Sequence, residues 1–243
     1  MSQFPTEVFE KWLSQRRINF TDKQVSQIEI YYELLLDWNQ RMNLTAITQS
    51  DEVIEKHFID SLTFLQLPFA DPTKPLTIID VGTGAGFPGL VLKIMCPSWS
   101  VTLLDSVGKK VRFLDTVIKE LKIDKIETIH GRAEDLAQMR EYRETFDICV
   151  SRAVANLMTL SEYCLPFVKI GGNMISYKAD KVHIELITAK RAITLMGGGN
   201  PQLCEVKLIQ SQTTRNLIII PKIKTCPIQF PRKAGTPQKL PIQ

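Results

Sequence analysis

The feature that most limits the possible folds is a change of pattern near residue 76. From there onward, short apolar runs alternate with amphipathic stretches of helical period. This alternation is typical of βαβ units, which build a mostly parallel sheet covered by helices on both faces. The predicted strands are residues 76–81, 100–104, 126–130, 146–150, 173–178, 203–209 and 216–220, and the predicted helices are 89–95, 109–121, 157–168 and 182–195.

The last two predicted strands are separated only by a short stretch, residues 211–215. A parallel crossover needs about a dozen residues or more, so this pair is predicted to be antiparallel. The sequence therefore predicts an α/β protein with a Rossmann-like, mostly parallel, seven-stranded sheet and an antiparallel final strand.

The first 70 residues indicate helices instead. Phe9 and Leu13 recur at helical spacing, and Thr21 forms a capping box with Gln24 at the start of a second helix. A third helix is predicted to begin near Ser50. Wide apolar stripes on these helices predict that they pack on one another or on the following domain.

A proline-rich connector follows at residues 67–75. We therefore divide the chain into an N-terminal helical extension, residues 1–70, and a main domain with a basic C-terminal tail, residues 71–243.

Composition favours a globular protein, since 44% of the residues are hydrophobic and 23% are charged. No apolar run approaches the roughly 20 residues that span a bilayer, and the first ten residues lack the order of a signal peptide. We expect a cytoplasmic protein that is not membrane-bound. No metal site is predicted, because the cysteines have no ligand spacing with the three histidines; they are Cys96, Cys149, Cys164, Cys204 and Cys226.

The net charge of +4 is unevenly distributed along the chain. Residues 1–70 carry ten acidic and six basic side chains, whereas no acidic residue follows Glu205. A tail of one sign suggests a polyanionic partner. A merely solubilising tail explains the charge equally well. The basic residues after Glu205 are Lys207, Arg215, Lys222, Lys224, Arg232, Lys233 and Lys239.

A glycine-rich segment follows the first predicted strand of the main domain. It contains the dinucleotide pattern Gly84-x-Gly86-x-x-Gly89 and also the methyltransferase pattern Gly82-x-Gly84-x-Gly86 after Asp80. A carboxylate at Asp80 would repel a pyrophosphate. The same carboxylate would attract the ammonium group of S-adenosylmethionine, which carries no phosphate.

Two further acidic residues follow the next two strands. Asp105 is placed to accept hydrogen bonds from ribose hydroxyls, and Glu134 is placed to accept one from the adenine amine. Together with Asp80 and the glycines, they favour S-adenosylmethionine as the cofactor. The predicted fold is therefore that of a class I methyltransferase.

Two motifs that activate nucleophiles are missing from the sequence. It has no Asn/Asp-Pro-Pro-aromatic stretch for exocyclic amines and no Pro-Cys pair for cytosine C5. Cys149 lies in an apolar strand and is interpreted as a core residue. Guanine N7 fits, because its lone pair needs no general base. Arg152 is the candidate catalytic residue, with an alignment or electrostatic role; a surface salt bridge is the alternative.

Several segments outside the glycine loop carry a resemblance to a known family. The chain resembles the ribosomal RNA small-subunit methyltransferase G family, also called glucose-inhibited division protein B, over nearly its whole length. The segments are residues 38–45 (WNQRMNLT), 57–62 (HFIDSL), 80–89, 104–106 with Lys109, Lys110, Phe113 and Leu114, 131–135, 151–153 (SRA) and 230–237 (FPRKAGTP).

The resemblance implies an enzyme that methylates N7 of one guanine in a loop of 16S ribosomal RNA. Its partner would be that RNA, the small ribosomal subunit or its precursor, and we expect a monomer. Ala179 departs from the family, where we expect glycine. The predicted cofactor contacts are Asp80, Gly82, Gly84, Gly86, Phe87, Asp105, Ser106, Ala133, Glu134 and Arg152.

The RNA contacts predicted alongside these are Asn43, His57, Lys178, Arg232 and Lys233. A capping role for Asn43 and a structural role for His57 are the alternatives. Two other functions stay open. One is methylation of another RNA, a protein or a small molecule; the other is nonenzymatic binding of RNA or a nucleotide.

Overall fold

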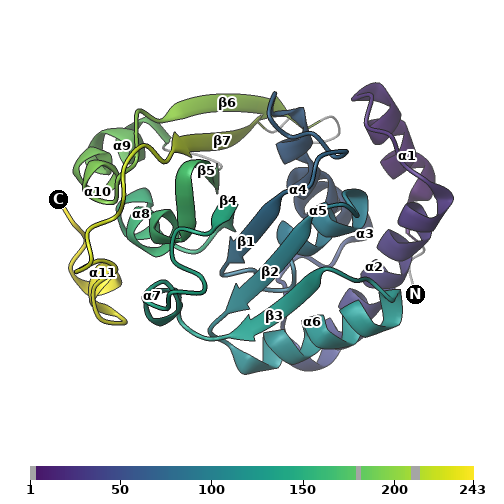
Figure 1. Cartoon of the computed structure of the whole chain (residues 1–243). Coiled ribbons are helices and arrows are strands. Elements are labelled where there is room, and N and C mark those ends of the chain that lie inside the picture. Colours follow the sequence, from purple (N-terminus) through teal and green to yellow (C-terminus); the bar gives the residue numbers. More distant parts are fainter. Residues whose placement is uncertain (1–3, 179–181, 209–213) are drawn as a thin grey trace.

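A seven-stranded sheet forms the centre of the protein (Figure 1). The computed structural model describes residues 4–178, 182–208 and 214–243. The strand order is β3-β2-β1-β4-β5-β7-β6, in which β1 to β5 run parallel and β7 is antiparallel to both neighbours. This confirms the predicted Rossmann-like sheet. The strands are β1 (Thr77–Val81), β2 (Ser100–Asp105), β3 (Ile126–His130), β4 (Phe146–Arg152), β5 (Val168–Lys178), β6 (Gln202–Lys207) and β7 (Thr214–Pro221).

The strand order reverses between β1 and β4. From β1 the chain moves outward to β2 and β3, then returns to pair β4 with the free side of β1. In open α/β sheets, ligands bind at such a switch point, outside the carboxyl ends of the strands. The loops that follow β1, β2, β3 and β4 all open at this edge.

Helices cover both faces of the sheet and enclose two hydrophobic cores. Neighbouring residues of β1 separate them: Ile78 belongs to one core and Ile79 to the other, as the alternation of side chains along a strand requires. The first core lies under α5 (Gly89–Met95) and α6 (Gly108–Leu121). The second lies under α7 (Ala133–Leu136), α8 (Leu157–Cys164), α9 (Val182–Thr188) and α10 (Lys190–Leu195) (Figure 1).

The N-terminal helices pack outside α5 and α6. The predicted capping box at the start of α2 is present, with Thr21 and Gln24 as partners. Tyr31 and Phe58 are fully buried in the same core as Ile78. The boundary at residue 70 stays a prediction. The N-terminal elements are α1 (Thr6–Gln15), α2 (Asp22–Met42), α3 (Ser50–Val53), a π-helical segment (Ile54–Ile59), α4 (Asp60–Leu62) and a 3-10 turn (Thr63–Gln66).

Several element boundaries differ from those predicted. The helix predicted over 157–168 ends at Cys164 and continues as a 3-10 turn, because Pro166 has no N–H group to continue the helical ladder. Strand β5 therefore begins at Val168, before the predicted start. The helix predicted over 182–195 is divided at Ala189 into α9 and α10.

Two short helices, α7 and α11 (Thr236–Lys239), were not predicted, because one turn is too short to show a helical period. The predicted end of β6 at Ile209 and the departure at Ala179 both lie outside the described residues.

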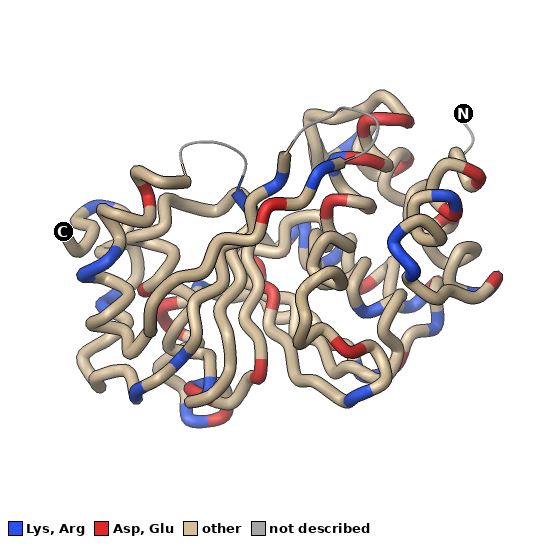
Figure 2. Tube along the Cα trace, turned by 90° about the horizontal axis from the view of Figure 1, so that it is seen from above, with Lys and Arg blue, Asp and Glu red and all other residues tan. Residues whose placement is uncertain are grey.

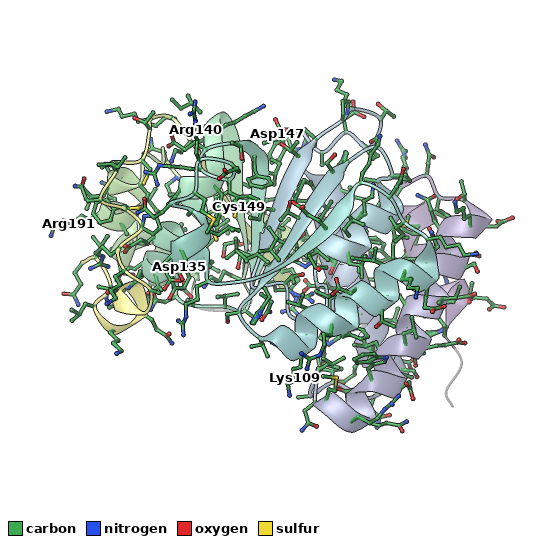
Figure 3. The ribbon with its side chains drawn as sticks, turned by 60° about the horizontal axis from the view of Figure 1, so that its bottom comes forward. Lys109, Asp135, Arg140, Asp147, Cys149 and Arg191 are labelled. Carbon is green, nitrogen blue, oxygen red and sulfur yellow. The ribbon has the colours of Figure 1, made fainter. Side chains whose placement is uncertain are left out.

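Cys149 lies in the interior, between the sheet and its helices (Figure 3), and is fully buried. This confirms its interpretation as a core residue. In the described ranges, no helix combines the length and apolar character that a membrane span requires. The same ranges hold no group of three or more His, Cys, Asp or Glu arranged to bind a metal.

Candidate active site

The glycine loop connects β1 to α5 and adopts a backbone that favours glycine. Gly82, Gly84 and Gly86 have φ angles of +72°, +64° and +105°, a region that residues with a Cβ rarely enter. The amide of Gly82 donates to Leu104 O at 2.8 Å. A Cβ on Gly82 would lie 2.4 Å from Cγ2 of Val154. The loop therefore lies against both β2 and the loop after β4.

Asp80 supports the glycine loop from inside the protein. It is fully buried, and its Oδ2 accepts hydrogen bonds from Thr83 Oγ1 at 2.7 Å and from the Gly89 amide at 2.8 Å. Its Oδ1 has no hydrogen-bond partner among the described residues. Burial raises the pKa of this carboxyl group to about 6. The structure thus places Asp80 behind the loop, and a contact with the cofactor stays a prediction.

Asp105 connects the end of β2 to the glycine loop. Its Oδ2 accepts a hydrogen bond from the Gly84 amide at 2.8 Å, and its Oδ1 accepts one from the Val107 amide at 2.8 Å. Lys110 lies 3.9 Å away and partly balances the charge. The next residue, Ser106, is exposed. The Asp105 carboxylate and the Ser106 hydroxyl thus belong to adjacent residues at the carboxyl end of β2, beside the point where the strand order reverses.

A pocket of about 170 Å³ opens at this point. Five predicted cofactor residues line it: Gly82, Asp105, Ser106, Ala133 and Glu134. The other predicted cofactor residues, Asp80, Gly84, Gly86, Phe87 and Arg152, lie outside its lining. The remaining lining residues are Val81, Leu104, Gly131, Arg132, Val154, Ala155, Tyr163 and Gln238.

Sequence reasoning missed Tyr163 and Gln238 in this pocket. Tyr163 belongs to α8, and Gln238 belongs to α11 near the C-terminus. Neither stands in a motif or at the end of a parallel strand, so no local signal marked them.

Phe87 joins the glycine loop to the N-terminal helices. Its ring stacks on the ring of His57, with centroids 4.7 Å apart and planes at 19°. The ring of Tyr31 stacks nearby at 5.4 Å. The Arg152 guanidinium lies 5.2 Å from the Phe87 centroid, within the range of a cation–π contact. Phe87 therefore packs against His57, Tyr31 and Arg152 and does not line the pocket at the switch point.

His57 is held as a neutral side chain. Its Nε2 lies 2.7 Å from the Thr45 hydroxyl. Burial, and secondarily the charge of Arg152, lower its pKa to about 3. His57 is thus uncharged at neutral pH and offers a flat ring surface rather than a positive charge.

Three charged residues from distant parts of the chain meet beside His57. Asp60 Oδ2 accepts a hydrogen bond from Arg152 Nη1 at 2.7 Å, and Asp60 Oδ1 lies 2.9 Å from Nε of Arg215. Asp60 is buried, whereas both arginines are partly exposed. The Asp60 carboxylate therefore positions two guanidinium groups, and the cluster of Asp60, Arg152 and Arg215 keeps a net positive charge.

These residues line a second pocket, of about 410 Å³. Four of its lining residues are basic and two are acidic. Ala153 lines this second pocket and the adjacent Val154 lines the first, so the two pockets are neighbours across the loop after β4. We call the second pocket the basic cleft. It is lined by Ile47, Lys56, His57, Asp60, Arg152, Ala153, Tyr177, Lys178, Glu185 and Arg215.

Only part of the predicted RNA contact set lies in the basic cleft. His57 and Lys178 line it, and Lys178 Nζ pairs with Glu185 at 2.8 Å. Asn43 instead ends α2 with a left-handed backbone and lines a separate pocket of about 570 Å³. Arg232 and Lys233 lie in the C-terminal tail. The structure therefore does not bring all five residues together.

The basic tail is partly neutralised by acidic residues from earlier in the chain. Arg232 binds Glu162 at 2.7 Å, and Lys222 binds Glu144 at 3.0 Å. Figure 2 shows Lys and Arg interspersed with Asp and Glu on both sides of the molecule. The exposed basic residues of the tail are Lys207, Lys224, Lys233 and Lys239.

The sheet order, the glycine loop at the switch point and the carboxylates after β2 and β3 define an S-adenosylmethionine-dependent methyltransferase of the Rossmann-like class I. A solved structure with this fold, M. jannaschii TYW2 in complex with AdoMet, gives a TM-score of 0.52 at 15% identity and covers 72% of this chain and 77% of that chain. At that identity, the likeness concerns the fold alone.

Sequence comparison then specifies the family. The family model for rRNA small subunit methyltransferase G matches residues 24–217. A relative of that name from Clostridium novyi is 48% identical over 93% of this chain and 92% of its own length. Another, from Lactobacillus johnsonii, is 45% identical over 97% of this chain and 99% of its own length. The chain belongs to the ribosomal RNA small subunit methyltransferase G family.

Proposed function

We propose that this protein transfers the methyl group of S-adenosylmethionine to N7 of one guanine in 16S ribosomal RNA. The observation that carries the proposal is the adjacency of two pockets across the loop after β4. The first presents the glycine loop, Asp105 and Glu134; the second is basic and contains the flat ring of His57. The names of the relatives support ribosomal RNA as the substrate.

The residues of the basic cleft suit a reaction that needs no general base. When bound, the cofactor supplies an electrophilic methyl group on a sulfonium centre. Guanine N7 already has a lone pair, so no side chain has to remove a proton. His57, with its pKa lowered to about 3, stays neutral. The contribution left to the protein is alignment and electrostatic stabilisation.

Arg152 is the residue best placed to orient the RNA. Its guanidinium is held by Asp60 and by the Lys56 carbonyl at 3.1 Å, and it lies over the Phe87 ring. A guanidinium held in this way can donate to a phosphate or to O6 of guanine, which leaves the N7 lone pair free to attack the methyl group. Its positive charge also favours binding of a polyanion. Arg152 would thus align the RNA without taking part in proton transfer.

We further propose that the protein acts as a monomer in the cytoplasm, on free 16S ribosomal RNA, the small subunit or a precursor particle. The lining of the basic cleft supports an RNA substrate over an uncharged small molecule, because its basic side chains outnumber the acidic ones.

Incubation with radiolabelled S-adenosylmethionine tests this function. The substrates are small-subunit RNA and small-subunit particles that lack the modification. We expect one labelled guanine, and no label when a short RNA substrate carries 7-deazaguanine, in which carbon replaces N7. Label on another base, on protein only, or on the 7-deaza substrate would overturn the assignment to guanine N7.

A further inference from the structure

The C-terminal segment 232–239 lies at the cofactor pocket, far in sequence from the rest of the site. Gln238 of α11 lines the same pocket as Gly82 and Asp105. The amide of Gly235 donates a hydrogen bond to Glu134 Oε1 at 2.8 Å. The segment therefore contacts a residue that sequence reasoning assigned to the cofactor.

Two anchors hold this segment on α8. Arg232 donates from Nε and Nη2 to the carboxylate of Glu162, at 2.9 and 2.7 Å, and Glu162 is buried. Further along, the Pro237 carbonyl accepts a hydrogen bond from Thr159 Oγ1 at 3.1 Å. These contacts place α11 at the pocket.

We propose that segment 232–239 is a wall of the cofactor site and that Gln238 is a binding residue for the adenosyl end of S-adenosylmethionine. This inference rests on the proposed function. It adds a tail segment and an amide side chain to a site otherwise built from the ends of parallel strands.

The hydrogen bonding of Glu134 supports this assignment. One carboxylate oxygen, Oε1, is occupied by the Gly235 amide, whereas Oε2 accepts no hydrogen bond within the described part of the chain. A carboxylate has acceptor capacity on both oxygens. Glu134 can therefore hold the wall with one oxygen and accept from the adenine amine with the other.

The chemistry of Gln238 also suits this position. A side-chain amide offers both donors and an acceptor, as does the edge of an adenine ring. Tyr163 stands in the same pocket and adds an aromatic surface. Small-molecule sites are commonly built in this way, from apolar surfaces with a few polar groups that set orientation.

The first test measures the affinity of Gln238→Ala for S-adenosylmethionine by calorimetry. Gln229→Ala is the matched control, because Gln229 is exposed in the same tail and does not line the pocket. Loss of one hydrogen-bonding side chain should raise the Kd about three- to tenfold in Gln238→Ala and leave the control unchanged. Equal affinities for the two variants would overturn the role of Gln238.

The second test uses hydrogen exchange of the wild-type protein with adenosine, methionine or S-adenosylmethionine added. Adenosine and S-adenosylmethionine should slow exchange of the amides of residues 232–239, and methionine should not. Unchanged exchange of these amides with adenosine bound would overturn the proposal that residues 232–239 form a wall of the cofactor site. If neither adenosine nor S-adenosylmethionine binds, both this inference and the proposed function fail. If both bind and residues 232–239 do not respond, only this inference is wrong.

Discussion

At the scale of single residues, the role of a charged side chain depends on its partner. Arg215, Lys222 and Arg232 belong to the acid-free stretch after Glu205, yet each pairs with an acidic residue from an earlier part of the chain. Lys233 is exposed beside Arg232. Two adjacent basic residues thus have different surroundings. Arg232 pairs with an acidic residue of the protein, whereas Lys233 is accessible to a polyanionic ligand.

Replacing Arg232 and Lys233 separately distinguishes these roles. Arg232→Ala leaves the buried Glu162 with only the backbone amide of residue 232 as a partner among the described residues. Loss of the guanidinium should lower the free energy of unfolding by about 2 kcal/mol. Lys233→Ala should change it by less than about 0.5 kcal/mol and should weaken RNA binding, with a smaller salt dependence. Urea denaturation and RNA titrations at several salt concentrations measure both effects. Equal loss of stability in the two variants would contradict the assignment.

The buried carboxyl group of Asp80 predicts a specific pH dependence of stability. Its pKa is raised to about 6 by burial, whereas an unfolded Asp titrates near about 4. Between these values the folded protein keeps a proton that the unfolded chain has lost. The Asp80 contribution to the free energy of unfolding should therefore fall as the pH rises from about 4 to about 6.

Comparison with Asp80→Asn isolates this contribution, because the other titrating groups are common to both proteins. The wild-type free energy of unfolding minus that of the variant should decrease over this interval and level off above it. Urea denaturation at a series of pH values gives the difference. A difference that is constant from pH 4 to 6, or that rises, would show that the carboxyl pKa is not raised.

At the scale of elements, the β1–α5 loop determines how the cofactor pocket is formed. Its three glycines have positive φ angles, and its amides reach the end of β2. The local pattern predicted this loop because backbone conformation is encoded in adjacent residues. Val154, whose side chain lies closest to the position of a Cβ on Gly82, belongs to the connection after β4. This approach was not predicted.

Gly82→Ala should therefore affect binding more than folding. The new Cβ would meet Val154 Cγ2 at 2.4 Å beside the pocket, and we expect the Kd for S-adenosylmethionine to rise about tenfold or more. Gly171→Ala is the control, since Gly171 also has a positive φ, +87°, and open space around it. Both variants should lose about 1–2 kcal/mol of stability. Similar cofactor affinities, measured by calorimetry, would argue against this role of Gly82.

At the scale of the whole molecule, the N-terminal helices complete the basic cleft. Asp60 comes from α4, Arg152 from the end of β4 and Arg215 from β7. His57 from the π-helical segment stacks on Phe87 of the glycine loop. Elements at both ends of the chain therefore meet at one site, and the extension contributes side chains to the cleft as well as apolar packing.

Asp60→Asn tests this arrangement. Loss of the buried carboxylate removes the counter-charge of two arginines, and we expect about 3 kcal/mol less stability together with a lower kcat for methyl transfer. Asp37→Asn is the matched control, because Asp37 pairs with Arg41 on the exposed surface of α2 and should cost about 1 kcal/mol or less. Denaturation and single-turnover labelling provide the measurements. An Asp60→Asn protein with wild-type stability would contradict the buried role.

The sequence by itself determined the order of strands and helices, the antiparallel end of the sheet, the glycine loop and the class of cofactor. These features were predictable because side-chain period, turn residues and strand ends are encoded by neighbouring residues. The break at Pro166 was missed although the missing N–H of proline is a local signal. The helices α7 and α11 were missed because a single turn is too short to show a helical period.

Only the tertiary structure decided which polar residues share a site. It paired Arg232 with Glu162, joined Asp60 to Arg152 and Arg215, and brought Gln238 to the pocket of Gly82. The physical reason is that an ion pair or a pocket depends on distance in space. Arg232 and Glu162 stand 70 residues apart in the chain, and no local pattern records that they meet.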